Sequence, residues 1–282
     1  MQKGEIGKFQ KTVWDFYTEN RRDLPWRPLA REGRGPKARA RTVSPYEILV
    51  SEFMLQQTQV DRVVPKFLAF IERFPTMQDL AVSSQKDVLS LWSGLGYNRR
   101  ALYLQKSVQA IFEAYKGVIA MDPSTLKSLP GIGDYMAHIL PVFIYNQKEV
   151  LIETNIRTVF LHHFFNGKEA VSDAEIFEKI RETLPTEDVR DWYYALMDYG
   201  SYLKKEKKIK NTTSAHYTKQ KPFKGSLRYV RGTLLKKLVM GKVLKEDVYD
   251  MFPEYSNKEI ESVCESLLKE GLMIETKKFF TL

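Results

Sequence analysis

Leu129-Pro130-Gly131-Ile132-Gly133 joins two segments with helical apolar spacing, 124–129 and 134–145. Two glycines around one apolar residue predict a tight hairpin with exposed backbone N–H groups. Because the second helix is expected to begin near Asp134, its positive end faces the same way as these groups. The stretch therefore predicts a helix–hairpin–helix that suits a phosphate oxygen, although an ordinary turn between packed helices would have the same pattern.

Helical apolar spacing extends outward from the hairpin over most of the chain. Further helices are expected at 9–17, from Ser44, and at 60–73, 86–92, 98–115, 155–165, 173–183 and 187–203. Ser44, Pro45 and Glu47 supply an N-cap, a first-turn proline and a capping box. Alternation typical of strands is nearly absent before residue 270, so the pattern predicts an all-α fold.

The chain divides into three regions by composition. Residues 1–203 are predicted to form the helical domain, interrupted at 27–43 by a basic loop rich in Arg, Gly, Pro and Ala. Residues 204–224 are polar and basic and are interpreted as a linker. In 225–282, helical stretches at 228–240, 245–251 and 257–270 precede a short alternating hairpin, which resembles a small winged-helix module.

The composition limits the classes of protein to consider. The 282 residues are 43% apolar and 28% charged, which is typical of a folded chain. No run of about 18 apolar residues occurs, so no membrane span is expected, and the polar start lacks the core of a secretory signal. A single cysteine, Cys264, excludes an internal disulfide and any site with several thiolate ligands.

The net charge of +9 favours a polyanionic partner, most simply nucleic acid. Two groups of basic residues hold much of this charge, and each is as consistent with a solvated loop as with phosphate contact. They are Arg27, Arg31, Arg34, Lys37, Arg39 and Arg41, and then Lys204, Lys205, Lys207, Lys208, Lys210, Lys219, Lys221, Lys224, Arg228 and Arg231.

Three more motifs accompany the hairpin. They are Ser-Glu-Phe-Met-Leu-Gln-Gln-Thr-Gln-Val at 51–60, Leu-Trp-Ser-Gly-Leu-Gly-Tyr-Asn-Arg-Arg-Ala at 91–101 and Ile-Glu-Thr-Asn-Ile-Arg at 152–157. In this order and spacing the four motifs resemble the helix-hairpin-helix (HhH-GPD) DNA glycosylases over about residues 9–203. The first two motifs and Leu24-Pro25-Trp26-Arg27 are similar to the MutY-type adenine branch. The resemblance implies base excision repair of double-stranded DNA by hydrolysis of an N-glycosidic bond.

Glu52 lies beside the apolar face of its predicted helix, where a half-buried carboxyl group would hold its proton near neutral pH. A surface glutamate on a helix flank is the alternative. The resemblance implies that Glu52 protonates the departing adenine. Glu153 occupies the position at which the family has an aspartate that stabilises the sugar cation, and adjacent Thr154 could cap the helix instead.

Tyr135 stands where bifunctional relatives carry a lysine, so the resemblance implies a monofunctional enzyme without strong lyase activity. Asn155 matches the family's asparagine near the catalytic carboxylate. Packing alone would also account for Tyr135.

Candidate DNA contacts fall into four groups. Polar side chains at a helix end can enter the gap that a flipped base leaves in the duplex, or they can simply cap the helix. An apolar loop tip can act as a wedge between bases, or its residues can belong to the hydrophobic core. The hairpin and the lysine run can bind phosphates. The groups are Gln56, Gln57 and Thr58; Leu95, Gly96 and Tyr97; Gly131, Ile132 and Gly133; and Lys205, Lys207 and Lys208.

The resemblance also carries one cofactor expectation and two departures. Carbonyls of Lys127, Leu129 and Ile132 are expected to hold a Na⁺ or K⁺ ion. The branch's iron–sulfur cluster needs four cysteines, which this chain lacks, and the roughly 60 residues after the linker are too few for its Nudix-like domain.

Two alternative functions remain open from the sequence: excision of thymine or uracil opposite guanine, and non-catalytic binding of duplex DNA. The expectation is otherwise of a monomer inside the cell, cytoplasmic and nucleoid-associated if the source is prokaryotic.

Overall fold

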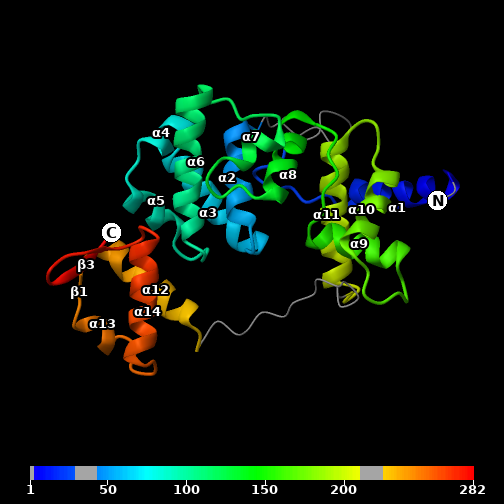
Figure 1. Cartoon of the computed structure of the whole chain (residues 1–282). Helices are drawn as coiled ribbons and strands as arrows, with labels where there is room; N and C mark the ends of the chain where they lie inside the picture. The colour runs from blue at the N-terminus through cyan, green and yellow to red at the C-terminus, as the bar shows by residue number, and fades with distance from the viewer. Residues whose placement is uncertain (1–2, 29–42, 210–224) are drawn as a thin grey trace. The chain divides into compact units, whose positions relative to one another are not determined.

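The computed structural model describes residues 3–28, 43–209 and 225–282, and these are mostly helical, as predicted (Figure 1). The first eleven helices are α1 (Lys3–Asn20), α2 (Pro45–Leu55), α3 (Val60–Arg73), α4 (Met77–Ala81), α5 (Gln85–Trp92), α6 (Arg99–Tyr115), α7 (Pro123–Lys127), α8 (Asp134–Tyr145), α9 (Thr154–Phe164), α10 (Asp173–Thr183) and α11 (Val189–Lys205). Helices α3, α8 and α10 have the predicted bounds. The sequence missed α4, whose five residues are too short to show a period.

Side-chain caps define several of these helices. The capping box predicted before α2 is confirmed: the Ser44 N–H donates to Glu47 Oε2 at 2.7 Å, and the Glu47 N–H donates to Ser44 Oγ at 3.1 Å. Thr76 starts α4 with a capping box of the same kind.

The chain forms two compact units that alternate along the sequence. The first comprises Met1–Leu49 and Ile119–Thr218, and the second Val50–Val118 and Lys219–Leu282. In the first unit α11 packs against α1 and α9, and the Phe9 ring lies 5.4 Å from that of Phe160 and 5.9 Å from that of Trp192. Aromatic packing therefore holds the N-terminal helix to the helices that follow the hairpin.

In the second unit α6 packs against α4 and α5, around the fully buried rings of Phe70, Phe74 and Trp92. The unit also contains the C-terminal module, with α12 (Leu227–Met240), β1 (Val243–Leu244), α13 (Asp247–Asp250), α14 (Asn257–Lys269), β2 (Ile274–Glu275) and β3 (Phe279–Thr281).

The three strands of this module form an antiparallel sheet in the order β1-β3-β2. Val243 pairs with Phe280, and Ile274 with Thr281. Three helices with a strand after the first and a hairpin at the end give the predicted winged-helix arrangement. The two-residue strand β1 was not predicted, because its pairing with β3 is long-range.

No helix among the described residues is both long and apolar enough to cross a membrane. Most of the predicted basic loop, residues 29–42, lies outside the described residues, as do Lys210, Lys219, Lys221 and Lys224 of the second basic group.

Candidate active site

The predicted hairpin is confirmed between α7 and α8. Gly131 has φ +77°, a left-handed conformation that favours glycine, and Gly133 is the extended N-cap residue of α8. Leu129 and Ile132 are 6% and 5% exposed and anchor the hairpin in its unit, whereas the two glycines are exposed. The first N–H groups of α8 have no acceptor within the helix, so this end can receive an anion.

Asp134 adds a negative charge at this helix start. Its carboxylate forms an ion pair with Lys127 across the hairpin, and this hydrogen bond holds the pKa of Asp134 below its usual range. Tyr135 is half-buried in the first turn of α8.

Glu153 is the N-cap of α9. Its Oε1 accepts hydrogen bonds from the backbone N–H groups of Asn155 at 2.7 Å and Ile156 at 2.9 Å. The idea that Thr154 would cap this helix is therefore wrong, because the longer glutamate side chain folds back onto the helix start. The same reach directs the carboxylate to the positive end of α9.

Burial raises the pKa of Glu153, opposed by the hydrogen bonds from Asn155 and Ile156 and by the nearby cations Lys204 and Arg22. The Asn155 side chain links two of these groups: its Nδ2 lies 3.5 Å from Glu153 Oε2, and its Oδ1 accepts from Lys204 Nζ at 3.2 Å. Glu153, Asn155 and Lys204 thus form one polar cluster, which we call the α9 cluster.

A glycine on α11 allows this cluster to form. A Cβ at Gly200 would lie 2.2 Å from the carbonyl oxygen of Asn155, so any larger residue would push α9 away from α11. The sequence analysis assigned no role to Gly200.

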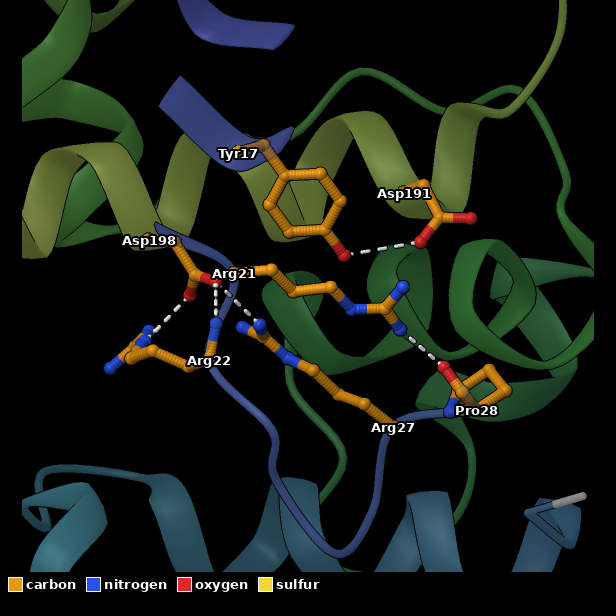
Figure 2. A network of polar contacts seen from close by, with 7 residues as sticks. All are labelled: Tyr17, Arg21, Arg22, Arg27, Pro28, Asp191 and Asp198. Atoms are coloured by element: carbon orange, nitrogen blue, oxygen red, sulfur yellow. Dashed lines mark hydrogen bonds and ion pairs between the residues drawn. The ribbon is translucent and has the colours of Figure 1, made fainter. Parts of the chain in front are cut away.

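Arg22 and Arg27 meet Asp198 in a buried network (Figure 2). The carboxylate accepts from the Arg22 N–H at 3.0 Å and Nε at 2.6 Å, and from Arg27 Nη1 at 2.9 Å. Arg27 is 3% exposed, and its guanidinium stacks 4.3 Å from the Tyr194 ring. Placing Arg27 among the loop residues available to phosphate was therefore wrong, since Asp198 holds it in the interior.

Glu52 lies in the last turn of α2 in the second unit and is 5% exposed. Its neighbours Val50, Phe53 and Met54 are fully buried. The expectation of a glutamate buried beside the apolar face of its helix is confirmed, with deeper burial than the half-buried position predicted, and the alternative of a surface glutamate is wrong.

Two loops of the second unit carry the predicted base-contacting residues. Gln57 is exposed with φ +52°, Gln56 is half-buried, and the Thr58 hydroxyl accepts from Arg100 Nη2 at 3.0 Å. In the other loop Tyr97 is 44% exposed, but Leu95 is only 3% exposed. The wedge interpretation therefore fits Tyr97, with exposed Gly96 beside it, and the alternative of a core residue describes Leu95.

The described part of the lysine run is exposed at the end of α11 and in the turn after it. Lys205 Nζ lies 3.9 Å from Glu206, and Lys207 Nζ lies 6.0 Å from the Tyr202 ring. Lys208 adopts a left-handed conformation, with φ +54°. Phosphate contact by these three lysines stays a prediction.

Within the described residues, no three His, Cys, Asp or Glu side chains are grouped to hold a metal ion. Cys264, the one cysteine, is buried in α14. The residues present therefore do not fit a four-cysteine iron–sulfur cluster.

Comparison with known families and proteins places this site in context. Residues 50–186 match the family described as HhH-GPD superfamily base excision DNA repair protein. The chain is 37% identical to the adenine DNA glycosylase of Mycolicibacterium smegmatis over 66% of this chain and 60% of that protein. It is 35% identical to the human adenine DNA glycosylase over 55% of this chain and 28% of that protein. The matched stretches thus span less than two thirds of these relatives.

Solved structures share the fold at lower identity. A thermostable thymine-DNA glycosylase superposes with a TM-score of 0.58 at 21% identity, over 70% of this chain and 87% of that one. Endonuclease III in a non-covalent DNA complex gives 0.57 at 17% identity, over 73% and 88%.

Proposed function

We propose that the protein is a monofunctional DNA glycosylase of the HhH-GPD superfamily that removes adenine mispaired with guanine or 8-oxoguanine, and the match of residues 50–186 to that superfamily supports this. Relatives named adenine DNA glycosylase, 35–39% identical, support adenine over thymine or uracil. The substrate is double-stranded DNA. The protein acts on it as a monomer inside the cell, and in a prokaryote this DNA is that of the nucleoid.

The observation that carries the proposal is the enclosed carboxyl group of Glu52. Low exposure disfavours the charged form of a carboxyl group, and the neutral form can donate a proton. Glu52 transfers its proton to a ring nitrogen of the flipped adenine. The electrons of the N-glycosidic bond then leave with a neutral base, and water adds to the sugar carbon.

The α9 cluster stabilises the sugar cation formed in this step. The Glu153 carboxylate is fixed by two backbone hydrogen bonds, and Asn155 reaches both Glu153 and Lys204. A preorganised negative charge of this kind lowers the barrier because it needs no rearrangement during the reaction. Tyr135 offers no amine at the lyase position, so water is the nucleophile.

DNA contacts complete the proposal. Gln56, Gln57, Thr58, Gly96 and Tyr97 face the gap left by the flipped base. The backbone of Gly131, Ile132 and Gly133 holds one phosphate, and carbonyls of Lys127, Leu129 and Ile132 hold a Na⁺ or K⁺ ion through lone pairs left over from the turn. Lys205, Lys207 and Lys208 bind further phosphates.

The test is a panel of duplex oligonucleotides, each with one mispair, scored by strand breaks after alkali. Adenine opposite guanine or 8-oxoguanine should be released, and undamaged A·T pairs should not. Preferential release of thymine or uracil opposite guanine would replace the adenine proposal. Tight duplex binding without release of any base would indicate a non-catalytic DNA-binding protein. Trapping of a protein–DNA adduct by borohydride would refute the monofunctional assignment.

A further inference from the structure

Arg100 is a buried cation between the two loops that carry Gln57 and Tyr97. It is 8% exposed and is the second residue of α6, directly after exposed Arg99. Burial lowers its pKa to about 10, so the guanidinium stays protonated at neutral pH. Its partners are backbone carbonyls and one hydroxyl, which makes it a structural connector of peptide groups.

One arm of the guanidinium holds the end of α2. Nη1 donates to the carbonyl oxygens of Phe53 at 2.9 Å and Met54 at 3.1 Å, and also to that of Gln56. The last four carbonyl groups of a helix have no N–H donor within the helix, and a cation placed there also complements the helix dipole. Arg100 therefore fixes the point at which α2 stops and the turn with Gln57 begins.

The other arm of the guanidinium reaches both loops. Nη2 donates to the Gly96 carbonyl at 3.0 Å and to the Thr58 hydroxyl at 3.0 Å. The Gly96 carbonyl also accepts from Trp92 Nε1 at 3.3 Å. A single side chain thus joins segments that lie about forty residues apart in the sequence.

Both loops contain residues in unusual backbone conformations. Gln57 and Tyr97 have φ +52° and +48°, a region that residues with a Cβ seldom adopt. Such conformations persist where surrounding contacts over-determine them. The two exposed side chains predicted to enter the duplex thus lie in left-handed turns whose flanking residues hydrogen-bond to Arg100.

We propose that Arg100 is a positioning residue that locks the Gln57 turn and the Tyr97 loop into one preformed surface for the gap left by the flipped base. The inference rests on the proposed glycosylase function. Arg100 acts through the two loops, because its own side chain is buried. Only a planar fork reaches both loops at once, so lysine, a point charge, cannot replace it.

The first measurement is amide hydrogen exchange of the free protein, wild type against Arg100→Lys. Loss of the fork should increase exchange about tenfold in both 56–59 and 94–98, with the core of α8 unchanged. Arg99→Lys, the matched control next to it, should leave both segments as in wild type. If only one loop, or neither, exchanges faster, the connection is refuted.

The second measurement is single-turnover excision. Arg100→Lys should lower the rate about tenfold, while the Kd for undamaged duplex changes less than twofold. Arg100→Lys should lower the rate by a smaller factor in the Tyr97→Ala background than in wild type, since the part of its effect that acts through the Tyr97 loop is already lost there. The positioning role would be overturned if the losses of Arg100→Lys and Tyr97→Ala were fully additive. It would also be overturned if folded Arg100→Lys excised the base at the same rate as the wild-type protein.

Two outcomes need separate arms. If Arg100→Lys does not fold, Thr58→Val is used instead, because it removes one hydrogen-bond acceptor of the Arg100 guanidinium, and Thr58→Ser, which keeps the hydroxyl, is its control. Amide hydrogen exchange in both loops should then be faster in Thr58→Val than in Thr58→Ser. If the wild-type chain releases no base, the proposed function fails, whereas exchange still reports whether Arg100 holds the two loops together. Equal amide exchange of the two loops in Thr58→Val and Thr58→Ser would refute the proposal that Arg100 joins them.

Discussion

The two candidate catalytic carboxylates differ in the polar groups that surround the buried position of each. Glu52 is 5% exposed in the last turn of α2, next to the fully buried Phe53 and Met54 in the sequence. Glu153 lies at the start of α9, where it accepts two backbone hydrogen bonds and has Lys204 and Arg22 nearby. At Glu153 these hydrogen bonds and cations favour the charged form and oppose the burial that raises its pKa, whereas at Glu52 the observation is low exposure alone, so we assign one residue type two roles.

The strongest way to break this comparison is Glu52→Gln. The amide cannot donate the proton of a carboxylic acid, so single-turnover excision should fall about 1000-fold while duplex binding is unchanged. The matched control is Glu72→Gln, at an exposed site on α3, which should behave as wild type. Excision at the wild-type rate by Glu52→Gln would remove the acid from the mechanism.

Loss of the second charge should cost less. Glu153→Gln keeps an acceptor oxygen for the cap but loses the negative charge, so the rate should fall about 100-fold at unchanged melting temperature. Glu153→Asp, which keeps the charge and is a good N-cap, should stay within about tenfold of wild type. Equal rates for Glu153→Gln and wild type would reduce Glu153 to a helix cap.

The buried network of Arg22, Arg27 and Asp198 can be tested by removing its negative charge. Asp198→Asn leaves Arg27 as an unpaired buried cation and frees Arg22, so the free energy of unfolding should fall by about 3 kcal/mol. The matched variant Asp191→Asn weakens the 3.2 Å hydrogen bond from the Tyr17 hydroxyl and removes an acidic charge from the first turn of α11, and should cost about 1 kcal/mol. Denaturant unfolding compares the two, and equal losses would contradict the network's role.

The smallest expected effect concerns pH. Because burial raises the pKa of Glu153, its carboxylate is lost at a higher pH than usual as the solution is acidified, and excision should decline there. Lys204 lowers that pKa, so Lys204→Met should move the acidic limb upward by roughly half a unit, and less at high salt. Lys106→Met, exposed on α6, is the control, and a downward shift in Lys204→Met would contradict the assignment.

Much of this architecture was accessible from local sequence. Apolar periodicity predicted ten of the eleven helices before residue 206, and Ser44 with Glu47 predicted where α2 begins. The hairpin followed from Gly131 and Gly133, and the cysteine count excluded an iron–sulfur cluster. The helices, the cap and the hairpin depend on residues within a few positions of one another, so sequence pattern suffices to predict them. The cysteine count needs composition alone.

Only the tertiary structure decided which polar groups meet. Arg27 and Asp198 are 171 residues apart in the sequence, and Arg100 lies 47 residues from the Phe53 carbonyl that it holds. Gly200 matters only because α9 passes directly over it, and Glu153 caps α9 because its carboxylate can reach the helix start. The sequence by itself determined the helices and the candidate acid, whereas the partners of each charge depend on packing between distant segments, which no local pattern records.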